Sequence, residues 1–167
     1  MDTTTFIICV DGPDQPGMLN ALSHTLTRYD GLWLTSKVNN LDGRFAALIR
    51  AQVPSEQFEP LQQALLSLES VHLRLHPVSA SPPNAQQYRW NIESDDKPSL
   101  VQDITTVLHN HGANIEQFNS HHLAIAESGM TAFSADLLIS AAASLDPLTI
   151  QQELKAQHGN LIIHPQN

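Results

Sequence analysis

The sequence has 167 residues, of which 41% are hydrophobic and 15% charged, so it can form one medium domain or two small ones with a buried core. Its 17 acidic residues outnumber its eight lysines and arginines, which gives a formal net charge of -9. The electrostatic field of this negative charge repels phosphate backbones, so we expect no direct binding to nucleic acid.

The termini and the cysteine content indicate the compartment. No apolar run approaches the roughly 18 residues of a membrane span, and residues 1–5 lack the basic-then-apolar order of a secretory signal. The single cysteine, Cys9, lies in the apolar run 6–10 and is interpreted as a buried hydrophobe rather than a nucleophile. These features predict a cytoplasmic protein that does not associate with membranes.

The first half of the chain alternates strand and helix patterns. Glycine at 31 is the stop expected at a helix end, and Asp42-Gly43 is a dipeptide typical of tight hairpins. In chain order, the patterns predict a strand at 6–10, a helix at 19–29, strands at 32–41 and 45–53, a helix near 61–65 and a strand at 71–75.

The second half repeats the first. Asp-Gln-Pro-Gly at 14–17 returns as Asp-Lys-Pro-Ser at 96–99, and Gly112 repeats the helix stop. The second hairpin turns through a longer loop that contains Glu127, Ser128 and Gly129. The predicted elements are a strand at 88–92, a helix at 101–108, strands at 113–125 and 131–140, a helix near 150–154 and a strand at 161–163.

The segment between the copies is rich in proline and serine and has neither a helical nor a strand period, as is typical of a linker. We therefore expect a domain at 1–77, a linker at 78–87 and a second domain at 88–167. The predicted fold class is α+β, with two ferredoxin-like βαββαβ domains. Each would have an antiparallel sheet with both helices on one face.

A strand, the motif at 14–17 and an amphipathic helix that ends in glycine together resemble an ACT domain. Two such domains are similar to the glycine cleavage system transcriptional repressor group of tandem ACT proteins, over about residues 4–165. The resemblance implies a regulatory protein, not an enzyme, that senses an amino acid, with glycine the first candidate. It also implies action through a partner transcription factor, which agrees with the acidic charge.

The loop before the first helix has the chemistry to bind an amino acid. Free amides at a helix N-terminus attract a carboxylate. Pro16 can open the helix because it has no N–H to leave unpaired, and Gly17 lets a ligand approach the backbone. Asp14 either caps the helix or accepts the ammonium group of the ligand.

In ACT pairs the ligand commonly contacts this loop in one domain and the start of the second strand in the other. Asn20 either extends the polar lining or is solvated. In a mirror site with Asp96, serine replaces glycine at Ser99, and the bulky Trp33 stands where a polar residue would be. The residues that the resemblance assigns to the ligand site are Asp11, Asp14, Gly17, Met18, Asn20, Asn114 and Ile115.

Other site chemistry is not indicated. The nine histidines lack zinc-ligand spacing, so we expect neither a metal nor a cofactor. No nucleophile with a base and no phosphate-binding glycine loop is visible. Three alternatives to glycine sensing stay open: an interaction module whose sheets pair into a homo-oligomer, a tandem ACT sensor of another small metabolite, and an enzyme acting on a small metabolite.

Overall fold

The computed structural model describes residues 2–78, 86–124, 131–142 and 146–166. The chain divides into two compact units, Met1–Ala80 and Ser81–Asn167. Most of the linker expected at 78–87 lies outside the described residues, and so does the loop that contains Glu127, Ser128 and Gly129.

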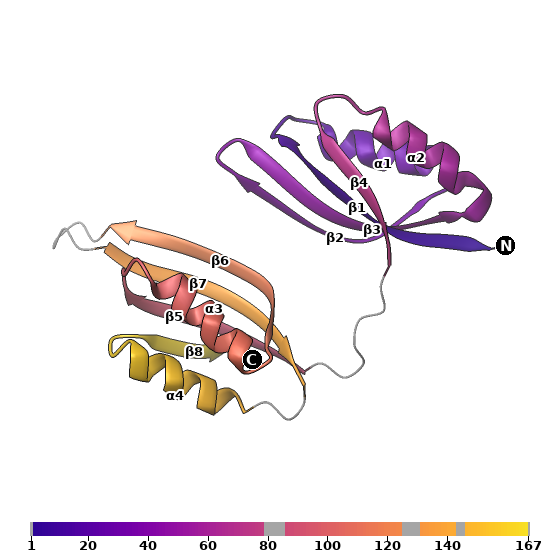
Figure 1. Ribbon diagram of the computed structural model, residues 1–167. Coiled ribbons are helices and arrows are strands. Elements are labelled where there is room, and N and C mark those ends of the chain that lie inside the picture. The colour runs from indigo at the N-terminus through magenta and orange to yellow at the C-terminus, as the bar shows by residue number, and fades with distance from the viewer. Residues whose placement is uncertain (1, 79–85, 125–130, 143–145, 167) are drawn as a thin grey trace. The chain divides into compact units, whose positions relative to one another are not determined.

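The first unit has one antiparallel sheet, with strand order β2-β3-β1-β4. Both long helices cover the same face of this sheet (Figure 1). The elements are β1 (Thr3–Pro13), α1 (Met18–Arg28), β2 (Leu32–Leu41), β3 (Arg44–Pro54), the short 3-10 helix η1 (Ser55–Gln57), α2 (Phe58–Leu66) and β4 (His72–Pro77).

The second unit repeats this arrangement with strand order β6-β7-β5-β8. The prediction of an α+β chain with two ferredoxin-like units is confirmed. The elements are β5 (Gln86–Asp95), α3 (Leu100–Asn110), β6 (Asn114–Ala124), β7 (Thr131–Ala141), α4 (Pro147–Gln157) and β8 (Ile162–Gln166).

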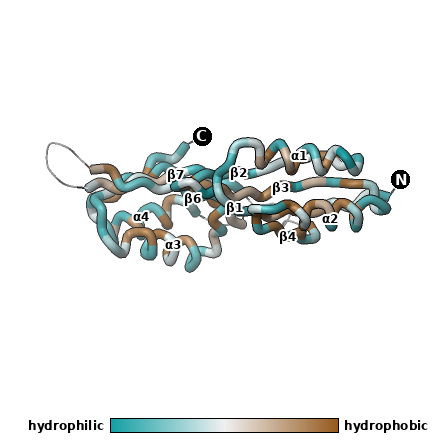
Figure 2. Tube along the Cα trace, turned by 90° about the horizontal axis from the view of Figure 1, so that it is seen from above, coloured by the Kyte–Doolittle hydropathy of each residue, from teal (hydrophilic) through white to brown (hydrophobic). Residues whose placement is uncertain are grey.

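Each unit buries its own hydrophobic core between the sheet and the helices. In β3 every second side chain is buried, as expected for a strand with one face covered. Hydrophobic residues recur along strands and helices in Figure 2. From the helices of the first unit, the fully buried side chains are Leu22, Leu26, Leu61 and Leu65.

The predicted tight hairpin at Asp42-Gly43 is confirmed. Both residues have positive φ angles, 46° and 75°, which is the requirement of a type I′ turn. Leu41 and Arg44 are therefore paired directly, and Asn40 lies opposite Phe45 in the next row. This turn fixes which β2 side chains reach the helix-covered face near the end of the sheet.

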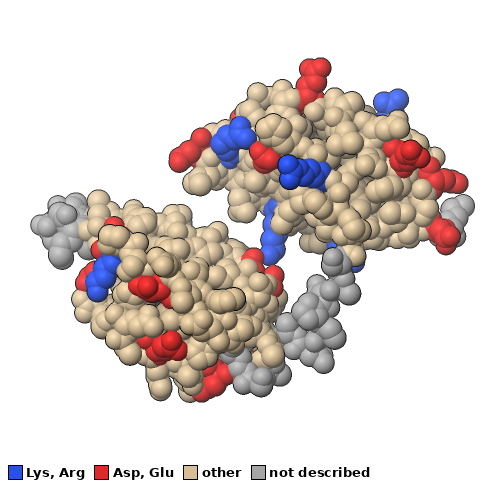
Figure 3. Space-filling view, in the orientation of Figure 1, with Lys and Arg blue, Asp and Glu red and all other residues tan. Residues whose placement is uncertain are grey.

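Acidic side chains are spread over the visible surface of both units (Figure 3), in keeping with the net charge of -9. None of the helices in the described ranges is long and apolar enough to cross a membrane.

Candidate functional site

A tight turn precedes α1. The amide of Met18 donates to the carbonyl of Gln15 at 3.4 Å, and Gly17 has φ 91° and ψ -2°. This is a type II turn, with proline and glycine at its two central positions. The helix begins at Met18, so the expectation that Pro16 opens it was wrong: the proline is held in the turn.

Among the residues that the structure describes, no side chain caps the N-terminus of α1, where Gly17 is the N-cap residue. Asp14 is therefore not the helix cap, one of the two interpretations left open by its position. Its own amide donates to the carbonyl of Gly43 at 2.8 Å, which ties the loop to the β2–β3 hairpin. With no capping side chain, the first amides of the helix are available to an anion.

Helix α4 shows what a capped start looks like in the same chain. The carboxylate of Asp146 accepts a hydrogen bond from the amide of Leu148 at 3.0 Å and from the hydroxyl of Thr149 at 2.8 Å. Both hydrogen bonds lower the pKa of the Asp146 carboxyl, and the bond from Thr149 has the larger effect. The start of α1 lacks an equivalent carboxylate, so an external one can take that place.

A cavity of about 240 Å³ lies beside the turn, between the start of α1 and the ends of β2 and β3. Small-molecule pockets commonly measure about 300–1,000 Å³, so this one suits a ligand smaller than a drug-sized molecule. The residues of the first unit that line it are Asp14, Gln15, Gly17, Met18, Leu19, Asn20, Val38, Asn40 and Phe45.

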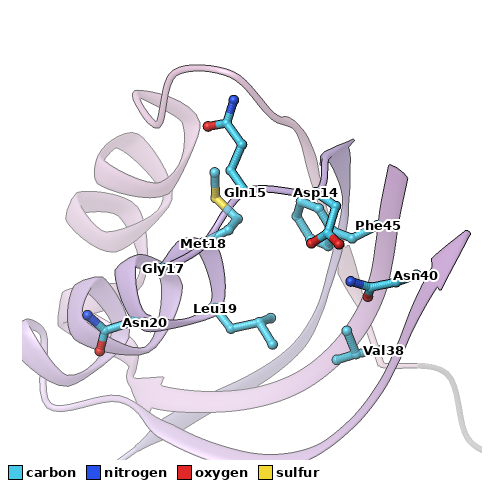
Figure 4. Close-up of a pocket in the computed structure, with 9 residues that line it drawn as sticks. All are labelled: Asp14, Gln15, Gly17, Met18, Leu19, Asn20, Val38, Asn40 and Phe45. Atoms are coloured by element: carbon cyan, nitrogen blue, oxygen red, sulfur yellow. The ribbon is translucent and has the colours of Figure 1, made fainter. Parts of the chain in front are cut away.

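The cavity combines polar groups with an apolar wall. In Figure 4 the carboxylate of Asp14 and the amide of Asn40 lie near each other beside Phe45, while Leu19 and Val38 point toward one another. Within the described part of the chain, the Asp14 carboxylate has no hydrogen bond or ion pair. A cationic group that entered the cavity could therefore pair with it.

Four of the residues assigned from sequence line this cavity: Asp14, Gly17, Met18 and Asn20. Met18 is half-buried and also packs against the first hydrophobic core. The side chain of Asn20 points away from the strands (Figure 4), as expected of a solvated helix position. Of these four residues, Asp14 and the backbone at Gly17 supply the polar chemistry at the cavity.

Asp11 lies on the opposite face of the sheet, because side chains alternate along β1 and its neighbour Gly12 faces the helices. Its carboxylate contacts Arg44 at 3.1 Å and His72 at 3.5 Å. Asp11 is therefore absent from the lining of the cavity.

Asn114 and Ile115 belong to β6 in the second unit. The side-chain amide of Asn114 donates to Glu116 at 2.8 Å, whereas Ile115 packs against the second core. Trp33, the bulky residue noted at the mirror site, packs against the first core.

Sequence reasoning missed five lining residues: Gln15, Leu19, Val38, Asn40 and Phe45. The signal for three of them was the Asp42-Gly43 turn. A two-residue turn fixes the register of a hairpin, so it places Asn40 opposite Phe45 and Val38 one row further along the same face. No group of three or more potential metal ligands occurs among the described residues.

The ACT domain family model matches residues 4–74, which run from β1 into β4 of the first unit. Over these residues the first unit is similar to an ACT domain. The second unit has the same element order and sheet topology, so the chain carries two units of the ACT architecture in tandem.

Two crystal structures share this fold over almost the whole chain. An unknown protein from Galdieria sulphuraria matches with a TM-score of 0.89 at 23% identity, covering 99% of this chain and 98% of the other. A "putative glycine cleavage system transcriptional repressor" matches with a TM-score of 0.70 at 16% identity, again covering 99% and 98%. No curated protein matched the sequence.

Proposed function

We propose that this chain is an amino-acid-responsive regulatory protein, with glycine as its first candidate ligand. The observation that carries the proposal is the cavity of the ACT domain, where an uncapped helix start, a carboxylate without a partner among the described residues and an amide side chain converge. A zwitterion carries the two charges that these groups complement.

The groups divide the work between the two ends of the ligand. The amides at the start of α1 would hold the carboxylate, and Gly17 leaves the approach to them open because nothing lies within 4 Å of the position a Cβ would take. The carboxylate of Asp14 would hold the ammonium group. The apolar wall of Leu19, Val38 and Phe45 would limit the size of the ligand side chain.

We further propose that the chain represses or modulates transcription of the glycine cleavage system through a partner transcription factor. The fold it shares with the repressor structure supports this, and so does the acidic charge, which disfavours direct contact with DNA. Transcript levels of the glycine cleavage system, measured in cells with and without the chain over a range of glycine concentrations, test this step.

Thermal melting against the twenty amino acids tests the sensing step. A ligand that binds only the folded state raises its stability by RT ln(1 + [L]/Kd), about 2.7 kcal/mol at a hundred times Kd. We expect a selective rise in melting temperature with glycine or a close relative. A flat profile over all twenty would contradict sensing of an amino acid.

The alternative function, a protein-interaction module without a ligand, is favoured by one surface. Four of the eight lysines and arginines of the chain lie on the open face of the first sheet, around Leu48, which is 52% exposed. These basic residues are Lys37, Arg44, Arg50 and Arg74. A flat melting profile together with concentration-dependent sedimentation would favour this function over sensing.

A further inference from the structure

The second unit contains a row of paired strand residues equivalent to the row at the cavity of the first unit, but with different side chains. In the first unit Gly12, Phe45 and Asn40 are paired across three strands. In the second unit Ser94, Phe133 and His122 occupy the same row. His122 therefore stands where the first unit has Asn40.

The loop carboxylates correspond as well. The amide of Asp14 donates to the carbonyl of Gly43 at 2.8 Å. In the same way, the amide of Asp96 donates to the carbonyl of Thr131 at 3.2 Å. Each aspartate thus leaves the end of the first strand of its unit and is tied to the hairpin beside it. The two carboxylates can be compared directly.

The Asp96 carboxylate, unlike that of Asp14, is fully engaged. Nδ1 of His122 lies 3.0 Å from its Oδ1, and the hydroxyl of Thr131 donates to its Oδ2 at 3.0 Å. The side chain of Asp96 is only 25% exposed. The imidazole is also packed edge-on against Phe133, with ring centroids 5.6 Å apart.

The turn before helix α3 also differs from the turn before α1. Ser99 has φ -89° and ψ -7°, the angles of the third residue of a type I turn. The amide of Leu100 donates to the carbonyl of Lys97 at 3.1 Å and closes this turn. Type I and type II turns differ mainly in the orientation of their central peptide. The amide of Ser99 therefore points differently from that of Gly17, whose φ is 91°.

We propose that His122 is an internal substitute for the ligand in the second unit, where it closes the equivalent of the first unit's cavity by holding Asp96. The inference rests on the proposed function of the first unit, because closure matters only if the open site binds. It assigns the choice between an open and a closed binding site to one position near the end of the second strand of each unit. Asn40 at this position leaves the site of the first unit open, and His122 closes the site of the second. The chain then binds one amino acid rather than two.

The contact itself is tested without any ligand, by long-range proton–nitrogen NMR correlations of the full chain at about pH 8.5, where histidine is ordinarily neutral. Donation to Asp96 requires the proton on Nδ1, so we expect the Nδ1–H tautomer for His122. Asp96→Ala should return it to Nε2–H, while the exposed His24 should be Nε2–H in both proteins. An Nε2–H tautomer of His122 in the parent overturns the inference.

Titration calorimetry with glycine tests the closure. The parent should bind one glycine per chain, and Asn40→His should weaken binding at least tenfold, whereas Asn39→His on the opposite face should not. The double variant His122→Asn with Ser99→Gly should gain a second site. Two sites in the parent, or only one in the double variant, would overturn closure. A parent with the Nδ1–H tautomer that binds no amino acid would refute the proposed function and leave the contact standing.

Discussion

Asn40 and Phe45 face each other across the β2–β3 hairpin, two residues before the turn on one strand and two after it on the other. The type I′ turn at Asp42 and Gly43 holds this pair in register. Because strand side chains alternate, Asn40 is directed to the cavity and its neighbour Asn39, which pairs with Ala46, to the opposite face. The sheet thus provides a matched pair of asparagines, one in the cavity and one outside it.

Asn40→Ala should weaken glycine binding by about 1–3 kcal/mol, or roughly five- to a hundredfold in Kd, because a polar group of the bound ligand loses its partner. Titration calorimetry measures the change, and Asn39→Ala is the control. Equal effects of the two substitutions would show that the cavity is not where the ligand binds.

In the second unit a hydrogen bond links helix α3 to the C-cap residue of α4. Nε2 of His158, whose side chain is 6% exposed, lies 3.0 Å from Oδ2 of Asp103 on α3. Nδ1 of His158 has no partner within the described part of the chain. Asp103→Ala would leave both ring nitrogens unpaired in a buried place, so we expect a loss of about 1–3 kcal/mol in the free energy of unfolding.

Urea denaturation measures this loss, and Gln102→Ala, on the solvent side of the same helix turn, is the control. If the variant with Asp103→Ala unfolded at the same urea concentration as the parent, the hydrogen bond would contribute nothing to stability.

The element order was predictable because both periodicities are strong and occur twice. The strand ends were not. β1 extends from Thr3 to Pro13, well beyond the apolar run 6–10, because pairing with β3 uses the backbone and tolerates polar residues such as Asp11. The hydrophobic pattern marks only the part of a strand that packs against the helices.

The loop half of the site was predictable, since proline and glycine determine the backbone directly. The predicted helix start at Pro16 was nevertheless wrong. Pro16-Gly17 is the signature of a type II turn, and this turn places the helix start at Met18. The strand half was missed because Val38 and Asn40 reach the cavity only through the register of the hairpin. Pairing across strands is a non-local property, and here one turn dipeptide held the information.

The purified chain should not bind DNA. A net charge of -9 opposes association with phosphate backbones, and we expect no change in the fluorescence anisotropy of a labelled duplex at about 0.15 M salt. Binding that strengthens steeply as salt is lowered would show that the basic face of the first sheet acts on nucleic acid directly, without a partner transcription factor.

The ACT resemblance predicts that Asn114 also contributes to glycine binding. Asn114→Ala should then cost about 1–3 kcal/mol of binding free energy, since its amide can both donate and accept. Asn119→Ala, at another exposed position of β6, is the control for changes to that strand. If calorimetry gave the parent Kd for Asn114→Ala, the cavity of the first unit would bind its ligand without Asn114.

Gly17 should be required for both stability and binding. An alanine Cβ would meet no atom within 4 Å, but the φ of 91° is strained for any L side chain. Gly17→Ala should therefore lower the free energy of unfolding by about 1–2 kcal/mol. Relief of that strain would turn the central peptide away from type II geometry, and glycine affinity should fall with it.

Two control substitutions separate strain from the loss of a glycine as such. Gly159→Ala introduces a Cβ into open space at a residue without a positive φ, and Ser99→Ala changes the mirror position, whose φ of -89° suits any residue. Both should leave the urea midpoint nearly unchanged and the Kd for glycine equal to that of the parent. If Gly17→Ala behaved like these two, the left-handed residue would be dispensable, and the helix amides would not be the groups that hold the carboxylate of the ligand.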